Sequence, residues 1–199
     1  MAQRPRKDVL RNNRAILRAT GELLQEDPSA VTIAAVAERA GLSVPTVYRY
    51  YASAEALLGR YMLEVLEELR DFSHDCDAPG VELFDRVLEE WGRLVDEYGA
   101  GLAQLRSRRG LLERLHAGDA QIATQRDAWE RPLRRVMRAE GIDDALFENV
   151  LFLYNQMFDP RELRDLRGQG LAMNEAIALM RPAFLAAVHR WGTDGARPL

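Results

Sequence analysis

One short stretch of this chain, residues 32–58, most strongly limits what the sequence can fold into. Thr32 is a good helix N-cap, because its hydroxyl can accept a hydrogen bond from a first-turn backbone N–H, and apolar residues then recur at helical spacing. Gly41 follows, where glycine commonly ends a helix in the left-handed conformation. Ser43 caps a second helix, which tolerates Pro45 in its first turn. The pattern predicts two short helices joined by a tight turn and followed directly by a third helix.

The second of these helices has polar and basic side chains on its outer face. It is about two turns long, so it depends on tertiary contacts for its stability. Thr46, Tyr48, Arg49 and Tyr50 provide hydroxyl groups and one guanidinium. A short polar helix beside a three-residue turn is typical of a helix-turn-helix, whose second helix enters the major groove of DNA. The sequence therefore predicts a helix-turn-helix over about residues 33–52.

The same segment resembles the DNA-binding domain of TetR-type (tetracycline-repressor-like) transcriptional regulators. The positions that match the family pattern are Ala37, Gly41, Leu42, Ser43, Thr46, Val47, Tyr48, Tyr50, Tyr51 and Leu57. The chain departs from that pattern at Ala54, where members usually have a lysine, and at Ala34 and Ala35, where polar or charged side chains are common. The resemblance covers about the first third of the chain. Beyond it, only the all-helical pattern and the length match.

Charge is distributed unevenly along the sequence. Residues 1–60 contain nine Lys and Arg against six Asp and Glu, whereas residues 61–199 contain eighteen against twenty-five. The first eighteen residues contain one acidic residue, Asp8, and six basic ones: Arg4, Arg6, Lys7, Arg11, Arg14 and Arg18. A basic end on an acidic body concentrates positive potential where DNA would bind. The alternative is a solvated tail and helix face.

The rest of the chain is expected to be helical throughout. Helices are predicted over about residues 8–26, 53–76, 81–98, 101–116, 119–140, 143–158, 160–167 and 171–191. Glycines, including Gly99 and Gly101, are expected to separate them, and Pro132 and Pro182 to bend two of them. Because no run alternates as a strand would, the sequence predicts an all-α fold. We expect a helix-turn-helix DNA-binding domain of three helices in residues 1–60 and a helical ligand-binding and dimerisation bundle in residues 61–199.

Two predicted helices near the C-terminus point to a second subunit. Residues 150–154 are consecutively apolar, so their helix needs cover on every side. The family dimerises through two C-terminal helices of each subunit, and the resemblance therefore implies a homodimer. The apolar residues expected to contribute from the last helix are Ile177, Met180, Phe184, Leu185 and Val188. A helix at the centre of a monomeric bundle is the alternative.

A ligand pocket is predicted in the C-terminal bundle, for a small apolar or aromatic effector. The candidate residues are Trp91, Tyr98, His116, Trp129, Phe152 and Asn155. Small-molecule sites combine large apolar groups with a few polar ones. Ordinary cores contain the same residue types, so each of these side chains has a core interpretation as well.

No pattern of residues typical of catalysis or of a bound cofactor occurs in the sequence. His74-Asp75-Cys76-Asp77 places four metal-ligand types in a row, but successive residues at a helix end point apart and no second cluster completes a site. We therefore expect no catalytic residues, no metal and no cofactor. No apolar run is long enough to span a membrane, and the N-terminus does not have the pattern of a secretory signal. With Cys76 as the only cysteine, these features favour the cytoplasm.

The DNA contacts expected from these patterns fall into two groups. Base edges would be touched by Thr46 and Arg49, with Val44 and Pro45 at the helix start, since arginine can bond guanine and apolar groups can meet a thymine methyl. Phosphates would be bound by Thr32, Ser43, Tyr48, Tyr50 and Ser53, which fix the register. Val47 and Tyr51 are expected to face the core, and Val44 shares their stripe.

The favoured hypothesis is a homodimeric transcriptional regulator that binds double-stranded operator DNA. A repressor that a small molecule releases from its operator fits best. Two alternatives remain open at this point. One is an all-α enzyme that uses polar residues of the C-terminal bundle, and the other is an interaction adaptor with a degenerate helix-turn-helix.

Overall fold

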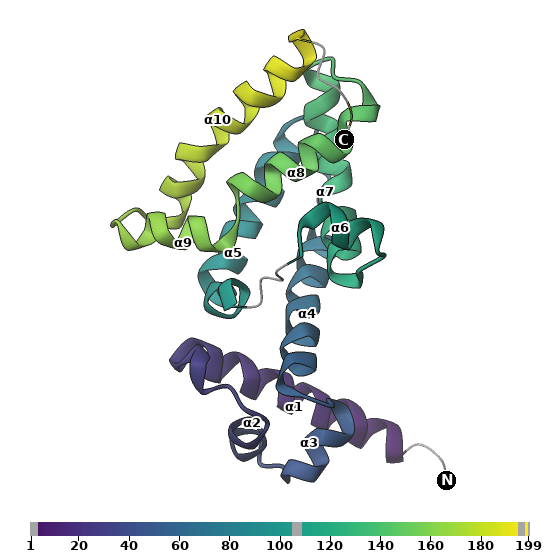
Figure 1. Cartoon of the computed structure of the whole chain (residues 1–199), viewed down its shortest axis with the longest axis vertical. Helices are drawn as coiled ribbons and strands as arrows, with labels where there is room; N and C mark the ends of the chain where they lie inside the picture. Colours follow the sequence, from purple (N-terminus) through teal and green to yellow (C-terminus); the bar gives the residue numbers. More distant parts are fainter. Residues whose placement is uncertain (1–3, 105–108, 195–197, 199) are drawn as a thin grey trace. The chain divides into compact units, whose positions relative to one another are not determined.

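The structure, a computed structural model, describes residues 4–104, 109–194 and 198, and over these ranges it contains helices and no strand (Figure 1). The prediction of an all-α fold is confirmed. The elements, in chain order, are α1 (Arg4–Glu26), the short 3-10 helix η1 (Pro28–Ala30), α2 (Ile33–Ala40), α3 (Val44–Tyr50), α4 (Ala54–Asp75), α5 (Glu82–Gln104), α6 (Leu111–His116), α7 (Ala120–Ala139), the 3-10 helix η2 (Asp144–Leu146), α8 (Phe147–Met157), α9 (Pro160–Gly168) and α10 (Met173–Asp194).

The chain forms two compact units. The first contains the described residues of Met1–Glu64 and Ala100–Arg106, and the second those of Val65–Gly99 and Ser107–Leu199. Both α4 and α5 therefore contribute residues to each unit. The functional boundary after residue 60 stays a prediction.

The first unit has a small apolar core that fixes α3. Ile16 of α1, Val36 of α2 and Val47 of α3 have no exposed surface. Tyr51, which directly follows α3, is also buried, and its hydroxyl donates to Asn13 Oδ1 at 2.5 Å. Burial raises the pKa of Tyr51, so this hydroxyl keeps its proton and acts as a donor. The predictions that Val47 and Tyr51 face the core are confirmed.

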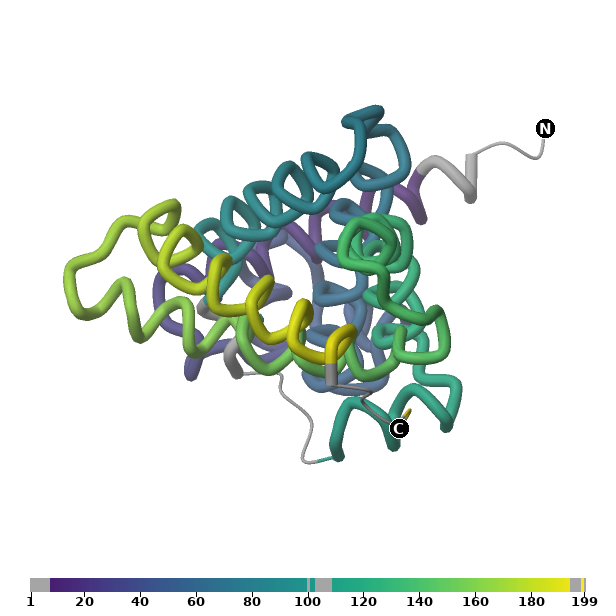
Figure 2. Tube along the Cα trace, turned by 90° about the horizontal axis from the view of Figure 1, so that it is seen from above, coloured from purple at the N-terminus to yellow at the C-terminus, as the bar shows by residue number. Residues whose placement is uncertain are grey.

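The second unit is centred on a group of aromatic side chains from α5, α7, α8 and α10. Phe84 stacks on Phe184 with 5.2 Å between ring centroids, and Trp129 lies against Tyr154 at 3.9 Å. Phe158, which follows α8, contacts both Tyr154 and Phe184. Figure 2 shows α10, in yellow, alongside the helices that it packs on. The unit is therefore held together by contacts between elements far apart in the sequence.

Two glycines that we expected to end a helix lie inside one. α5 continues through Gly99 and Gly101 to Gln104, so the predicted helix end near residue 98 is wrong. A Cβ atom on Gly99 would lie 2.9 Å from Arg164 Cδ, and one on Gly101 would lie 2.8 Å from Leu24 Cδ1. Glycine is present here because neighbouring side chains approach the backbone. Of the helix predicted over residues 101–116, the structure has α6 at its C-terminal end. Residues 105–108 of that predicted helix lie outside the described residues.

Most of the apolar residues expected to form a subunit contact on α10 are buried within their own chain. Phe184 and Val188 have no exposed surface, and Ile177 is also buried. The hypothesis that these three residues meet a second subunit is therefore wrong, because they already form the core of the second unit. For Met180 and Leu185, which are half-buried, it stays a prediction. The large apolar side chains left exposed on α8 and α10 are Phe152 and Leu179, at 38% and 57% exposure.

Candidate nucleic-acid interface

The turn between α2 and α3 is built by local hydrogen bonds. Thr32 Oγ1 caps α2 by accepting from Ala35 N at 3.1 Å. Gly41 ends the helix with φ of 65°, a conformation that side chains with a Cβ rarely adopt. Leu42 N then donates to Ala37 O at 2.9 Å, which closes the helix end. The chain is thereby turned within three residues to begin α3.

The rotation of α3 about its own axis is set by Val47. Because that side chain is fully buried and an α-helix has 3.6 residues per turn, Pro45 and Arg49 lie on the opposite, exposed face. Tyr48 is 53% exposed and Val44 38%. These four residues form the outer surface of the helix, called here the α3 face. Thr46 and Tyr50 are half-buried beside it.

Three of the predicted phosphate-binding residues share one structural role, that of N-cap. Thr32 caps α2, Ser43 caps α3 by accepting from Thr46 N at 3.3 Å, and Ser53 accepts from Ala56 N at 3.1 Å at the start of α4. A hydroxyl that accepts from the backbone still has its own O–H to donate. Ser43 and Thr46 also share a hydrogen bond at 2.8 Å between their hydroxyls. Thr32 and Ser53 are therefore the exposed caps with a proton to donate to a phosphate oxygen.

Arg49 differs from the other arginine near the turn in having no charged partner. Within the described part of the chain it makes no ion pair or hydrogen bond. Arg39, by contrast, is bound by both carboxylate oxygens of Glu26, at 2.9 and 2.7 Å, and by Glu22 at 3.5 Å. The hydrogen bond to Arg39 lowers the pKa of Glu26, so the pair stays ionised and its charges cancel. The guanidinium of Arg49 therefore has no counter-charge beside it on the α3 face among the described residues.

The basic residues of α1 divide in the same way. Arg11 pairs with Asp8 at 3.4 Å and Arg18 with Glu22 at 3.6 Å. Arg14 is exposed and has no partner among the described residues. The side chains of Arg4, Arg6 and Lys7, which we also expected to attract DNA, lie outside the described part.

The six candidate pocket residues of the second unit lie in different environments. Trp129 is fully buried in the aromatic core, and Trp91 is 4% exposed, with its indole N–H donating to Phe158 O at 2.9 Å. Asn155 Oδ1 accepts from Gln125 at 3.1 Å, and Tyr98 is half-buried. His116 and Phe152 are exposed. The predicted pocket that would unite them stays a prediction.

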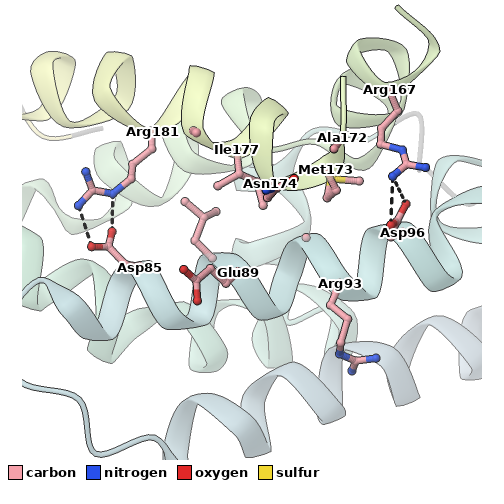
Figure 3. Close-up of a pocket in the computed structure, with 13 residues that line it drawn as sticks. Asp85, Glu89, Arg93, Asp96, Arg167, Ala172, Met173, Asn174, Ile177 and Arg181 are labelled. Atoms are coloured by element: carbon pink, nitrogen blue, oxygen red, sulfur yellow. Dashed lines mark hydrogen bonds and ion pairs between the residues drawn. The ribbon is translucent and has the colours of Figure 1, made fainter. Parts of the chain in front are cut away.

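A groove that sequence reasoning missed lies between α5 and α10 (Figure 3). Its volume is about 590 Å³, and none of the six candidate residues lines it. One end is closed by Arg181 and Asp85, with 2.5 and 2.8 Å between their nitrogen and oxygen atoms. The other is closed by Arg167 Nη1, 2.9 Å from Asp96 Oδ1. The residues of each pair are 96 and 71 positions apart, so no local pattern in the sequence signals them.

The C-terminal end of α4 is held by one arginine of α7. Arg131 Nη1 donates to Ser73 O at 3.2 Å and to His74 O at 2.9 Å, and its Nη2 donates to Cys76 O at 2.5 Å. His74 Nε2 lies 3.3 Å from Asp127.

In the described residues no group of three or more His, Cys, Asp or Glu side chains is arranged to hold a metal ion. Nor does any helix among them have the length and apolar character needed to cross a membrane.

Comparison with known proteins gives a family match to one segment and a structural match over most of the chain. Residues 16–61 match the family of bacterial regulatory proteins, tetR family. A crystal structure of a candidate transcriptional regulator from Pseudomonas aeruginosa PAO1 superimposes with a TM-score of 0.56 over 89% of this chain and 92% of that one. At 14% sequence identity, that likeness establishes the fold alone. Comparison with curated protein sequences gives no match. The family match spans α2, the turn and α3, where the geometry described above is found.

Proposed function

We propose that this chain, whose residues 16–61 match the tetR family of bacterial regulatory proteins, is a homodimeric DNA-binding repressor that a small molecule releases from its operator. The observation that carries the proposal is the α3 face. It presents one unneutralised guanidinium, from Arg49, between exposed apolar and phenolic side chains. A catalytic role is not part of the proposal.

The α3 face is suited to reading base edges. Arg49 can form two hydrogen bonds to one guanine, and Val44 and Pro45 can contact a thymine methyl group. The hydroxyls of Thr32 and Ser53, at the ends of two other helices, can donate to phosphate oxygens on either side. Phosphate contacts fix the position of α3, and base contacts then select the sequence.

A homodimer is supported by the apolar residues that α8 and α10 leave exposed. Leu179, Ala183 and Ala186 recur at helical spacing on the exposed side of α10, and Phe152 is exposed on the neighbouring α8. Two subunits related by a two-fold axis would bind two half-sites of a palindromic operator.

The subunit contact can be tested by one charge substitution. Leu179→Glu is expected to give a monomer in light scattering, because a carboxylate would be buried at the contact. Val9→Glu, at a similarly exposed apolar residue of α1, is the control and should stay dimeric. Equal masses for the two variants would contradict the proposed contact.

The regulatory cycle can be tested by selecting fragments of the chain's own genome. The purified protein is incubated with fragments in the presence and absence of a small-molecule extract, and bound DNA is sequenced. We expect enrichment of a palindromic site without extract, loss of that enrichment with extract, and weaker enrichment by Arg49→Ala with relaxed preference at one base position per half-site. Failure of the wild-type chain to enrich any fragment would overturn DNA binding. Enrichment only with extract would overturn release by a ligand.

A further inference from the structure

The groove between α5 and α10 has the size and apolar floor of a small-molecule site. Its volume of about 590 Å³ lies within the range of ligand pockets. The floor is formed by Leu88, Met173 and Ile177, all buried. Gly92 lies beneath them, and a Cβ there would collide with the Ile177 side chain and approach Met173 Cγ to 3.2 Å. The absence of a side chain at this position therefore brings α10 close to α5 and gives the groove its base.

The groove is elongated and closed at both ends. Asp85 and Asp96 are eleven positions apart on α5, which corresponds to about 16 Å along a helix. Each is paired with an arginine across the groove, Arg181 at one end and Arg167 at the other (Figure 3). These ion pairs neutralise both aspartates and limit the length of a molecule lying between them.

The negative charge of Glu89 on the groove is only partly compensated, because Glu89 shares its partner Arg86 with Glu82. Glu89 lies between the two ion pairs, as Figure 3 shows, and its carboxylate forms an ion pair with Arg86 at 3.7 Å. Arg86 also pairs with Glu82 at 3.4 Å. The third arginine of the lining, Arg93, points away from α10, and its guanidinium is bound by three other carboxylates. The excess of acidic residues in the C-terminal part of the chain reinforces the negative potential.

The groove lies on a different side of α10 from the proposed subunit contact. Its residues on that helix include Asn174, Ala178 and Arg181. Helical geometry places them across the axis from Leu179 and Ala183. A ligand and a second subunit can therefore be bound at the same time.

We propose that the α5–α10 groove binds an elongated amphipathic cation. The apolar body of the molecule lies along Leu88, Met173 and Ile177, and its positive group meets Glu89. Binding itself does not depend on the proposed function. The regulatory consequence does, because it identifies this cation as the molecule that releases the operator.

The groove has a direct connection to α4, the helix that contributes residues to both units. Arg93, on the α5 wall, contacts Glu68 of α4 with 2.5 Å between Nη2 and Oε1, and it also binds Glu90 and Glu97 on its own helix. A molecule that displaces α5 relative to α10 would alter this contact. The change would reach α4, which contributes residues to both units and follows the helix-turn-helix in the chain.

The binding site can be tested on the full chain by calorimetry with dodecyltrimethylammonium below its micelle concentration. Dodecyl sulfate has the same chain with the opposite charge, and tetramethylammonium has the charge without the chain. We expect saturable binding of one dodecyltrimethylammonium per chain and much weaker binding of the other two. Equal binding of the sulfate, or binding without saturation, would overturn the proposal.

Two variants locate the site. Glu89→Gln is expected to lower affinity for the cation about three- to fivefold, as for a partly exposed charge pair. Glu82→Gln is the matched control, since it also faces Arg86 on α5 but lies outside the groove, and it should bind as the wild type does. Ala178→Phe fills the groove from an exposed position and should abolish saturable binding while helical circular dichroism is retained. Equal affinities for the two glutamine variants, or undisturbed binding by a folded Ala178→Phe protein, would refute the site.

A gel-shift assay with a selected operator separates this inference from the proposed function. If dodecyltrimethylammonium releases DNA from the wild type at lower concentration than from Glu89→Gln, both are supported. If the cation binds with the expected dependence on Glu89 but leaves the DNA complex intact, the site stands and its regulatory role is overturned. If the protein retains no DNA at all, the proposed function fails, and the calorimetry still decides the site.

Discussion

Arg131 gives the sharpest test of how the second unit holds α4. Its guanidinium donates to three backbone carbonyls at the C-terminal end of that helix, those of Ser73, His74 and Cys76. The last carbonyls of a helix have no partner within the helix itself. Arg131 satisfies them and places a positive charge where the helix dipole is negative. Arg131→Met removes both effects while keeping most of the apolar stem.

The size of the effect follows from these contacts. Hydrogen bonds to a charged group contribute about 1.5–3 kcal/mol each, and a cation at a helix C-terminus contributes about 0.3–1 kcal/mol. The three bonds share one half-buried guanidinium, and water can replace it at the exposed His74 carbonyl, so the contributions do not add in full. We expect Arg131→Met to lower the free energy of unfolding by about 2 kcal/mol, well above the effect of an ordinary surface substitution.

Urea denaturation followed by tryptophan fluorescence measures this loss of stability in the second compact unit, to which Arg131 belongs. All three tryptophans, Trp91, Trp129 and Trp191, belong to the second unit. With a slope of about 2 kcal/mol per molar urea, the midpoint should fall by about 1 M. Arg135→Met, on the same helix but without a partner among the described residues, is the control and should shift it little. Equal midpoints for the two variants would refute the role given to Arg131.

Three further substitutions test the DNA interface. Arg49→Ala should cost about 1–3 kcal/mol and relax preference at one base position per half-site; equal losses on specific and random DNA would make Arg49 a phosphate contact. Arg14→Ala should weaken binding to all sequences alike and reduce the slope of affinity against salt by about one counterion, whereas an unchanged slope would leave α1 without a role. Ala54→Lys should tighten binding generally by adding a cation at the start of α4. If titrations show no gain, this helix end lies farther from phosphate than the family pattern implies.

The helix-turn-helix could be predicted closely because its signals are local. Thr32 and Ser43 each form their capping hydrogen bond with a residue three positions later, and Gly41 adopts the left-handed conformation that its sequence context indicates. The inward direction of Val47 follows from the helical period alone. None of these features needs knowledge of a distant part of the chain.

The second unit was predicted less well because its decisive contacts are long-range. Gly99 has the same local appearance as a helix stop, and only the approach of Arg164 explains why α5 continues through it. The groove is likewise defined by pairs such as Arg181 with Asp85, which a single sequence does not reveal. The sequence predicts a subunit contact for Phe184 because an apolar residue on an amphipathic helix has the same pattern whether it packs on another subunit or on its own core.

Both proposals depend on α4, because ligand binding in the groove has to act on DNA binding through this helix. A ligand in the groove can change DNA binding only if its affinity differs between the DNA-binding and the released arrangements, and couplings of about 1–3 kcal/mol are typical. The contact between the groove wall and α4 through which such a difference would act is that between Arg93 and Glu68. Because coupling between two binding equilibria is reciprocal, operator DNA would weaken ligand binding by the same factor by which the ligand weakens DNA binding. The two measured factors therefore have to agree, whichever molecule occupies the groove.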